Sequence, residues 1–239
     1  MTRPSLEKFI LKVSGELLSG YSEGIYDDKM ISAFARNLKE ALDDGVKAAL
    51  LVGGGNILRG SEMERIGLKR VSADQAGMIA TIVNGIILKD WLGAYNINSV
   101  LFSPIPVGSL ARQYIPQEAE GLMNSGGVPI LAGGTGNAYF TTDTAVVLRG
   151  IELGVDVVLK GTKVRGLFTD DPIREPTAEF IERVDYKDYI DNNYRVMDLT
   201  AIVLAMQYKI PIIIFNIFEL GNLNRVIRGE GIGTYISEI

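Results

Sequence analysis

The residues best suited to chemistry lie in a glycine-rich stretch, residues 133–144, which reads Gly-Gly-Thr-Gly-Asn-Ala-Tyr-Phe-Thr-Thr-Asp-Thr. The apolar run 128–132 before it is typical of a buried strand. Residues 143–153 have the apolar spacing of a helix, and Gly154 follows as a stop signal. A glycine turn at a helix start presents backbone N–H groups and the positive end of the helix dipole, which favours an anion. A tight connection without a ligand is the alternative, but it does not call for three glycines, several hydroxyls and an Asp.

A second glycine loop, residues 53–60, follows the apolar run 48–52 and reads Gly-Gly-Gly-Asn-Ile-Leu-Arg-Gly. Consecutive glycines let the backbone lie against a ligand with its N–H groups exposed. Arg59 follows at a distance from which its planar fork could take a phosphate in two bonds. The alternative is a flexible loop with a solvated arginine.

Two lysines stand at the ends of apolar runs that read as strands. Lys12 closes the run 9–13 and precedes Ser14 and Gly15, and Lys160 closes the run 155–160. In an open α/β sheet the ligands bind at the carboxyl ends of the strands. Both lysines and both glycine loops fall at such ends, which predicts a single shared site.

The composition excludes whole classes of chemistry because the chain contains no cysteine and no histidine. It can form no disulfide, no Cys or His zinc site and no Ser-His-Asp triad. The remaining groups are carboxylates, Lys, Arg, hydroxyls and backbone N–H groups. These suit phosphoryl transfer, in which positioning and charge stabilisation do most of the work.

Charge and hydropathy also limit the partners. The net charge of −5 argues against general binding of nucleic acid, which needs a basic face. The longest apolar run, 76–88, is interrupted by Thr81 and Asn84 and is shorter than a membrane span. The polar N-terminus has no signal-peptide pattern. We therefore expect a cytoplasmic protein with neither nucleic acid nor membrane as a partner.

Strand and helix signals alternate along the 239 residues without a Pro- or Ser-rich linker. This order predicts a mostly parallel sheet with helices on both faces, built as one domain. The polar segment 61–68 is expected to be mobile. Ser72 and Gln75 have the spacing of a capping box for a long helix. The part of that helix from 77 to 92 is apolar nearly all round, which predicts a subunit interface as well as a core.

Neither a P-loop nor a Gly-x-Gly-x-x-Gly turn after the first strand is present. The motifs that are present resemble those of the bacterial uridylate kinases, a branch of the amino acid kinase superfamily, from about Phe9 to the C-terminus. The matching segments are Lys12–Glu16, Gly53–Gly60, Ala73–Gly85, Gly134–Asn137, Phe140–Asp143, Lys160–Thr162, Asp171–Pro172 and Val196–Leu199.

This resemblance implies an amino acid kinase fold, a three-layer αβα sandwich, over one domain of residues 1–239. It implies transfer of the γ-phosphoryl group of ATP to UMP, giving UDP in pyrimidine nucleotide biosynthesis. It also implies a homohexamer, activation by GTP and inhibition by UTP. Residues 20–25 correspond to the segment linked to GTP activation.

The resemblance also assigns site residues by position. The residues implied on the ATP side are Lys12, Val13, Ser14, Gly15, Gly55, Arg59, Thr162, Phe168 and Asp171. Those implied on the UMP side are Gly54, Asp74, Thr135, Gly136, Asn137, Ala138, Tyr139, Phe140, Thr141 and Thr142. From the residues alone, Asp74 could equally be a favourable charge in a first helical turn. Phe168 could equally be a core aromatic.

The implied chemistry needs no general base, because the phosphate of UMP is already anionic at neutral pH. Lys12 and Lys160 would neutralise the transferring phosphoryl group, and Arg59 would hold phosphate oxygens. Mg²⁺ would arrive with ATP, held mainly by phosphate oxygens and waters, without a metal site of the protein's own. Asp143 or Asp198 would act as an orienting carboxylate.

The chain departs from the family pattern at three positions. Arg165 stands where the family usually has Asp, Lys69 where it often has Asp or Asn, and Ala138 where it often has Pro. Arg165 bears on how the adenosine end is held. Two other hypotheses remain open: a relative of the same fold that phosphorylates a carboxylate or another small acid, and a nucleotide-binding storage or regulatory protein without turnover.

Overall fold

The first strand, β1 (Lys8–Val13), shows how the sequence builds its layers. Successive side chains of a strand point to opposite faces of the sheet. Phe9, Leu11 and Val13 pack into one apolar cluster, whereas Ile10 packs into a second cluster on the other face. Lys12 shares the face of Ile10. The sheet is therefore buried on both sides, as a parallel sheet must be.

The computed structural model describes residues 5–172 and 174–238, which contain a nine-stranded sheet in the order β4-β3-β5-β2-β1-β6-β10-β11-β9. Every neighbouring pair is parallel except β10 and β11. The other strands of this sheet are β2 (Lys47–Val52), β3 (Ser99–Ser103), β4 (Arg112–Gln113), β5 (Val128–Leu131), β6 (Val157–Thr162), β9 (Arg183–Asp185), β10 (Ile212–Asn216) and β11 (Thr234–Ser237). A separate hairpin pairs β7 (Leu167–Phe168) with β8 (Phe180–Ile181). The sheet includes strands from both ends of the chain, which favours the expected single domain.

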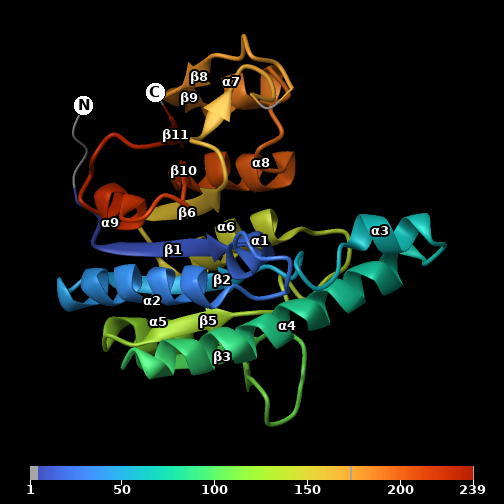
Figure 1. The fold of residues 1–239 in the computed structure, drawn as a ribbon, viewed down its shortest axis with the longest axis vertical. Coiled ribbons are helices and arrows are strands. Elements are labelled where there is room, and N and C mark those ends of the chain that lie inside the picture. Colours follow the sequence, from blue (N-terminus) through green and yellow to red (C-terminus); the bar gives the residue numbers. More distant parts are fainter. Residues whose placement is uncertain (1–4, 173, 239) are drawn as a thin grey trace.

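Helices cover both faces of the sheet, as Figure 1 shows. The cluster on one face takes side chains from α1 (Gly15–Ser19), α2 (Asp28–Asp43), α4 (Arg70–Ala94) and α9 (Asn222–Ile227). The cluster on the other face takes them from α5 (Pro116–Asn124), α6 (Thr142–Leu153), α7 (Tyr186–Asp191) and α8 (Leu199–Tyr208). The predicted three-layer αβα sandwich is confirmed.

The region before α4 contains a helix that the sequence did not predict, and the predicted start of α4 is wrong. The segment 61–68, which the sequence led us to expect to be mobile, is largely helical, because α3 (Gly60–Arg65) occupies it and packs against α4. The long helix begins at Arg70, and its N-cap residue Lys69 makes no side-chain cap bond. The Ser-x-x-Gln spacing at 72–75 therefore lies inside the helix. An ion pair of 3.3 Å between Arg70 and Glu64 joins the two helices and stabilises the earlier start.

Helix α4 is long and apolar enough, by length and composition alone, to cross a membrane. It spans 25 residues, so it extends well beyond the apolar run read from the sequence. Core helices of soluble proteins meet the same test. Here α4 packs on the sheet, and its fully buried Asn84 donates to the carbonyl oxygen of Gly53 at 2.7 Å. These contacts make α4 a structural helix of the sandwich.

The backbone conformation of Gly154 allows a direct test of how α6 ends. Gly154 ends α6 with a left-handed φ of 61°, and a Cβ there would meet only the Lys8 Nζ atom at 3.9 Å. Substitution Gly154→Ala should lower the free energy of unfolding by about 1 kcal/mol, because the left-handed conformation is unfavourable for alanine. Urea denaturation followed by circular dichroism measures the change.

The matched control is Gly121→Ala, the same substitution inside helix α5. A Cβ at Gly121 meets no atom within 4 Å, and the residue is exposed. Alanine there should raise the free energy of unfolding by up to about 1 kcal/mol, because it has the higher helix propensity. Changes of the same sign in the two variants would contradict the left-handed end of α6.

Candidate active site

Lys12 and Lys160 are direct neighbours, because β1 and β6 are parallel and these two residues stand in register. Neighbouring strands lie about 4.8 Å apart. Both lysines share their strand face with Ile10 and Val158, which pack toward α6 and α8. Two ammonium groups so close together require a negative partner when water has little access to them.

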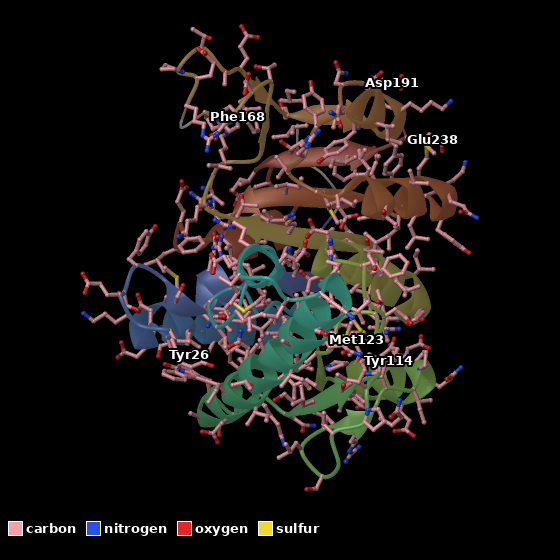
Figure 2. All side chains as sticks on the ribbon, turned by 90° about the vertical axis from the view of Figure 1, so that its right-hand side faces the viewer. Tyr26, Tyr114, Met123, Phe168, Asp191 and Glu238 are labelled. Atoms are coloured by element: carbon pink, nitrogen blue, oxygen red, sulfur yellow. The ribbon has the colours of Figure 1, made fainter. Side chains whose placement is uncertain are left out.

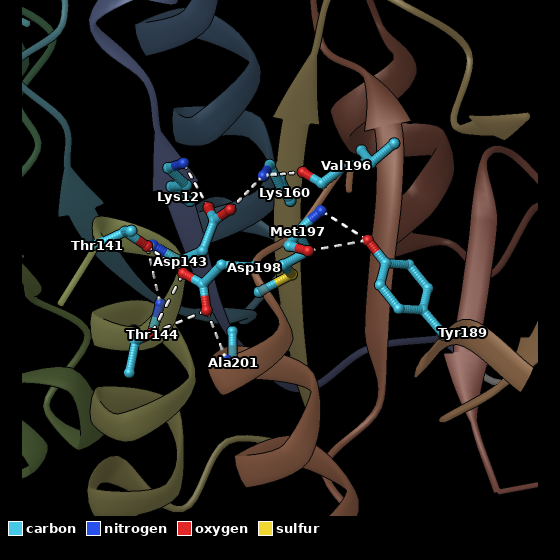
Figure 3. Close-up of polar contacts among 10 residues, drawn as sticks. All are labelled: Lys12, Thr141, Asp143, Thr144, Lys160, Tyr189, Val196, Met197, Asp198 and Ala201. Carbon is cyan, nitrogen blue, oxygen red and sulfur yellow. Dashed lines mark hydrogen bonds and ion pairs between the residues drawn. The ribbon is translucent and has the colours of Figure 1, made fainter. Parts of the chain in front are cut away.

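Asp143 supplies that partner from the first turn of α6. Its Oδ1 atom accepts from Lys12 Nζ at 2.5 Å, and its Oδ2 atom accepts from Lys160 Nζ at 2.6 Å (Figure 3). The Asp143 and Lys160 residues are each 8% exposed. The structure thus brings Lys12, Lys160 and Asp143, three of the residues predicted to act in catalysis, into one largely buried ion cluster.

Burial and charge set the protonation of this cluster. Burial alone would raise the pKa of Asp143, but attraction to Lys12 and Lys160, with their hydrogen bonds, outweighs it and holds the pKa well below its usual value. For Lys160, burial and repulsion by Lys12 outweigh the attraction of Asp143 and lower its pKa to about 8. Asp143 is therefore ionised at neutral pH, and the lowered pKa of Lys160 brings its titration closer to that range.

Hydroxyl groups fix the start of α6 beside the cluster. Thr141 is the N-cap residue, and its Oγ1 atom accepts from the Asp143 backbone N at 2.9 Å. Thr141 and Thr144 both donate to the carboxylate of Asp198, the latter at 3.0 Å. Asp198 also caps α8 by accepting from the Ala201 backbone N at 2.8 Å. One carboxylate therefore joins the starts of α6 and α8.

The loop before α6 needs its glycines. Gly133, Gly134 and Gly136 have φ values of 82°, 59° and 85°, in the left-handed region that side chains disfavour. The carbonyl oxygens of Gly134 and Thr135 accept from the guanidinium of Arg149, each at 3.4 Å. Arg149 is 6% exposed, so the loop is held from inside the molecule while its other side faces a cavity.

This cavity has a volume of about 360 Å³ and lies between the two glycine loops and α4. Seven of the ten residues implied on the UMP side line it: Gly54, Asp74, Thr135, Asn137, Phe140, Thr141 and Thr142. Gly136, Ala138 and Tyr139 belong to the same loop. Thr142 lines the cavity and directly precedes Asp143 of the ion cluster in the chain.

Asp74 stands in the second turn of α4, not in a first turn as the sequence suggested, because the helix begins at Arg70. Its Oδ2 atom accepts from Arg70 Nε at 2.8 Å and from the Tyr139 backbone N at 2.7 Å. The carboxylate thus ties the helix to the 133–140 loop across the cavity. Arg70, Met78 and Thr81 also line the cavity, and the sequence did not single out these three.

The second glycine loop packs against the turn that follows β1. A Cβ on Gly15 would lie 2.4 Å from Asn56 Oδ1 and 2.5 Å from Asn56 N, so glycine is required there. Ser14 caps α1, a helix that the sequence did not predict. Arg59 donates to Glu16 at 2.9 Å and to the Gly55 carbonyl oxygen at 3.3 Å. Its guanidinium is half exposed beside these loops rather than joined to the ion cluster.

The remaining residues implied on the ATP side lie farther along the chain. Thr162 ends β6 and donates to the Val164 carbonyl oxygen at 2.7 Å. Phe168 packs edge-on against Phe180 with ring centres 5.6 Å apart, in the part of the molecule labelled at the upper left of Figure 2. The guanidinium of Arg165 lies 4.0 Å from the centre of the same Phe180 ring.

Asp171 is exposed and forms an ion pair of 3.5 Å with Arg174. The sequence placed Thr162, Phe168 and Asp171 on one side of the site. The structure puts Thr162 at the end of β6, whereas Phe168 and Asp171 lie beyond it in and after the β7 strand.

Comparisons with known proteins agree with this geometry. The sequence model of the amino acid kinase family matches residues 7–216. A uridylate kinase from Photobacterium profundum is 42% identical over 236 residues, covering 98% of each chain. A uridylate kinase from Escherichia coli is 41% identical, covering 99% of this chain and 98% of its own.

Solved structures give the same result. A UMP kinase from Bacillus anthracis superposes with a TM-score of 0.94 at 33% identity, over 99% of this chain and 97% of its own. A UMP kinase from Ureaplasma parvum superposes with a TM-score of 0.90 at 28% identity, over 99% of this chain and 100% of its own. With its lysine–aspartate cluster, its two glycine loops and these full-length matches, the chain belongs to the uridylate kinases of the amino acid kinase family.

Proposed function

We propose that the protein transfers the γ-phosphoryl group of ATP to UMP, giving ADP and UDP. The observation that carries this proposal is the Lys12–Asp143–Lys160 cluster beside a cavity lined by glycine loops and hydroxyls. The family membership and the names of the relatives support the choice of UMP as acceptor.

The reaction needs charge and position more than proton transfer. A phosphate oxygen of UMP attacks the γ-phosphorus atom of ATP, and the bond to the β-phosphate oxygen breaks. The ammonium groups of Lys12 and Lys160 stabilise the charge on the transferring group. Asp143 keeps both ammonium groups in place, and its ionised state at neutral pH suits that role. The absence of histidine is then no obstacle.

On the ATP side we propose that the N–H groups of Gly15 and Gly55 and the guanidinium of Arg59 hold phosphate oxygens. Arg59 must then exchange Glu16 for phosphate, which its half-exposed position allows. We also propose contacts of Val13, Ser14, Thr162, Phe168 and Asp171 with the nucleotide. Mg²⁺ enters as part of the nucleotide substrate, because both oxygens of Asp143 already accept from ammonium groups. Phosphate oxygens and waters are its expected ligands.

On the UMP side we propose that Asp74 accepts from the sugar hydroxyls, with Arg70 and the Tyr139 backbone N fixing the direction of its carboxylate. The glycine loop from 134 to 137 and the hydroxyls of Thr141 and Thr142 form the rest of the pocket. Phe140 is 48% exposed and lines the cavity, which leaves its ring available to a pyrimidine.

We also propose that the enzyme is a cytoplasmic homohexamer that GTP activates and UTP inhibits. Helix α4 supports the assembly part of this proposal. Ile79, Val83 and Ile86 lie on one side of α4 and are 49%, 42% and 36% exposed. An apolar stripe of this kind on a structural helix is typical of a subunit contact.

The test is direct separation of nucleotide products after incubation with Mg·ATP and UMP, CMP, dUMP, AMP or a small carboxylic acid, with and without GTP. We expect UDP from UMP and much slower turnover of the other acceptors. Phosphorylation of an acid alone would replace this function by that of a carboxylate kinase. Binding of both nucleotides without UDP would indicate a storage or regulatory protein.

Substitution Asp143→Asn separates catalysis from binding. An amide cannot balance two ammonium groups, and its NH₂ group would face one of them. We expect kcat to fall by about 10²- to 10³-fold. The dissociation constant for UMP should stay within a few-fold, because Asp143 does not line the cavity. Steady-state kinetics and isothermal titration calorimetry give the two quantities.

The control for charge is Asp156→Asn, at the opposite end of the same pair of strands. Asp156 is exposed and accepts from the Lys8 backbone N at 2.9 Å. This variant should keep kcat within twofold of the original protein. If Asp143→Asn behaves like Asp156→Asn, the cluster is not the catalytic centre.

The lowered pKa of Lys160 predicts that kcat/KM and the free energy of unfolding change in opposite directions as the pH rises above 8. Loss of its charge above pH 8 should decrease kcat/KM for ATP, which reports ionisations of the free enzyme. Unfolded lysine titrates near 10.5, so the unfolded chain binds more protons than the folded chain between pH 8 and 10.5. The free energy of unfolding should therefore rise across this window as far as Lys160 is concerned.

Product chromatography between pH 6 and 9.5 measures the activity, and Lys160→Met isolates the residue's contribution to the stability curve. We expect the rise in stability above pH 8 to be smaller in that variant, since methionine does not titrate. A kcat/KM that stays level up to pH 9.5 would contradict a required charge on Lys160.

A further inference from the structure

Lys160 has a second partner besides Asp143. Its Nζ atom donates to the carbonyl oxygen of Val196, which lies in the connection between α7 and α8 (Figure 3). Residues 192–198 of this connection belong to neither helix and to no strand, since β9 ends at Asp185 and β10 begins at Ile212. The backbone that carries the Val196 carbonyl oxygen therefore has no regular ladder of hydrogen bonds to hold it.

Tyr189 provides the missing support. Its hydroxyl accepts from the Met197 backbone N at 2.7 Å and donates to the Met197 carbonyl oxygen at 3.0 Å. The side chain is fully buried, and burial raises its pKa to about 12. The hydroxyl thus stays protonated and holds both polar groups of one residue.

The three residues 196–198 then have separate tasks. Val196 accepts from Lys160, Met197 is held by Tyr189, and Asp198 accepts from Thr141 and Thr144 at the start of α6. Because the three are consecutive, a shift of Met197 moves the partners of Lys160 and of the α6 N-terminus together.

Resting on the proposed function, we propose that Tyr189 is a positioning residue for phosphoryl transfer. By holding Met197 it fixes the Val196 carbonyl against Lys160 and the Asp198 carboxylate against the helix that carries Asp143. It acts through the backbone of residues 196–198 and contacts no substrate.

The test is Tyr189→Phe, which removes the hydroxyl and keeps the ring. Displacement of a catalytic group by a fraction of an ångström should lower kcat roughly tenfold, with the KM values for ATP and UMP within twofold. A merely structural residue would lower stability without this separation of kcat from KM.

The chain offers a matched control in Tyr186→Phe. Tyr186 lies on the same helix α7, is 2% exposed and donates its hydroxyl to the Ile210 carbonyl oxygen at 2.7 Å, away from residues 196–198. Both variants lose one buried hydroxyl, so both melting temperatures should fall, and that of Tyr189→Phe should fall further because its hydroxyl has two backbone partners. Only Tyr189→Phe should have a lower kcat than the original protein. Equal kcat values in the two variants would overturn the proposal.

Hydrogen exchange supplies a readout that needs no substrate. In the full-length protein without ligands, the backbone N–H of Met197 should exchange at least tenfold faster in Tyr189→Phe than in Tyr186→Phe, because it loses its acceptor. Unchanged exchange would also overturn the proposal. If the original protein forms no UDP, the proposed function fails, and this exchange measurement still decides whether Tyr189 holds the segment.

Discussion

The placement of two lysines in register on neighbouring parallel strands is the constraint on which the site depends. Strand spacing alone sets Lys12 and Lys160 close together, and the pleat turns both toward α6. Without Asp143, the buried Lys160 ammonium group and the partly buried Lys12 ammonium group would repel each other, and removing one partner of a buried ion pair costs roughly 3–5 kcal/mol. The start of α6 is therefore fixed by electrostatics as well as by packing, and the glycine loop before it must end where Asp143 can reach both lysines.

Much of this arrangement was predictable because the relevant signals are local. Apolar runs that end in Lys12 and Lys160, and glycine runs that follow strands, need no knowledge of distant residues. The rest depends on contacts between distant segments. The start of α4 depends on Arg70 meeting Glu64, and Arg59 meets Glu16 from a loop 43 residues away. The same holds for Tyr189, whose spacing within α7 is that of any core aromatic; only the fold places its hydroxyl on Met197.

The site combines a rigid side with an open side. Buried polar groups hold the backbone from within: Arg149 the carbonyl oxygens of the 133–136 loop, and Asn84 the carbonyl oxygen of Gly53. Groups that we propose to contact nucleotides, such as Arg59 and Phe140, are about half exposed. This division suits phosphoryl transfer, because preorganised charges stabilise the transition state while exposed groups can exchange their partners for substrate.

Besides the Asp143 carboxylate, neutral side chains and backbone groups fix the charged residues of this site. Asp198 illustrates this, since hydroxyls of Thr141 and Thr144 and the Ala201 N–H take up its oxygens. The Val196 carbonyl oxygen accepts from Lys160, and the Tyr189 hydroxyl holds the neighbouring Met197, so both support Lys160 without adding charge. Another carboxylate in their place would neutralise the ammonium groups that stabilise the transferring phosphoryl group in the proposed reaction. Apart from Asp143, the supports around Lys160 are therefore neutral, and under the proposed function they leave its positive charge available to the nucleotide.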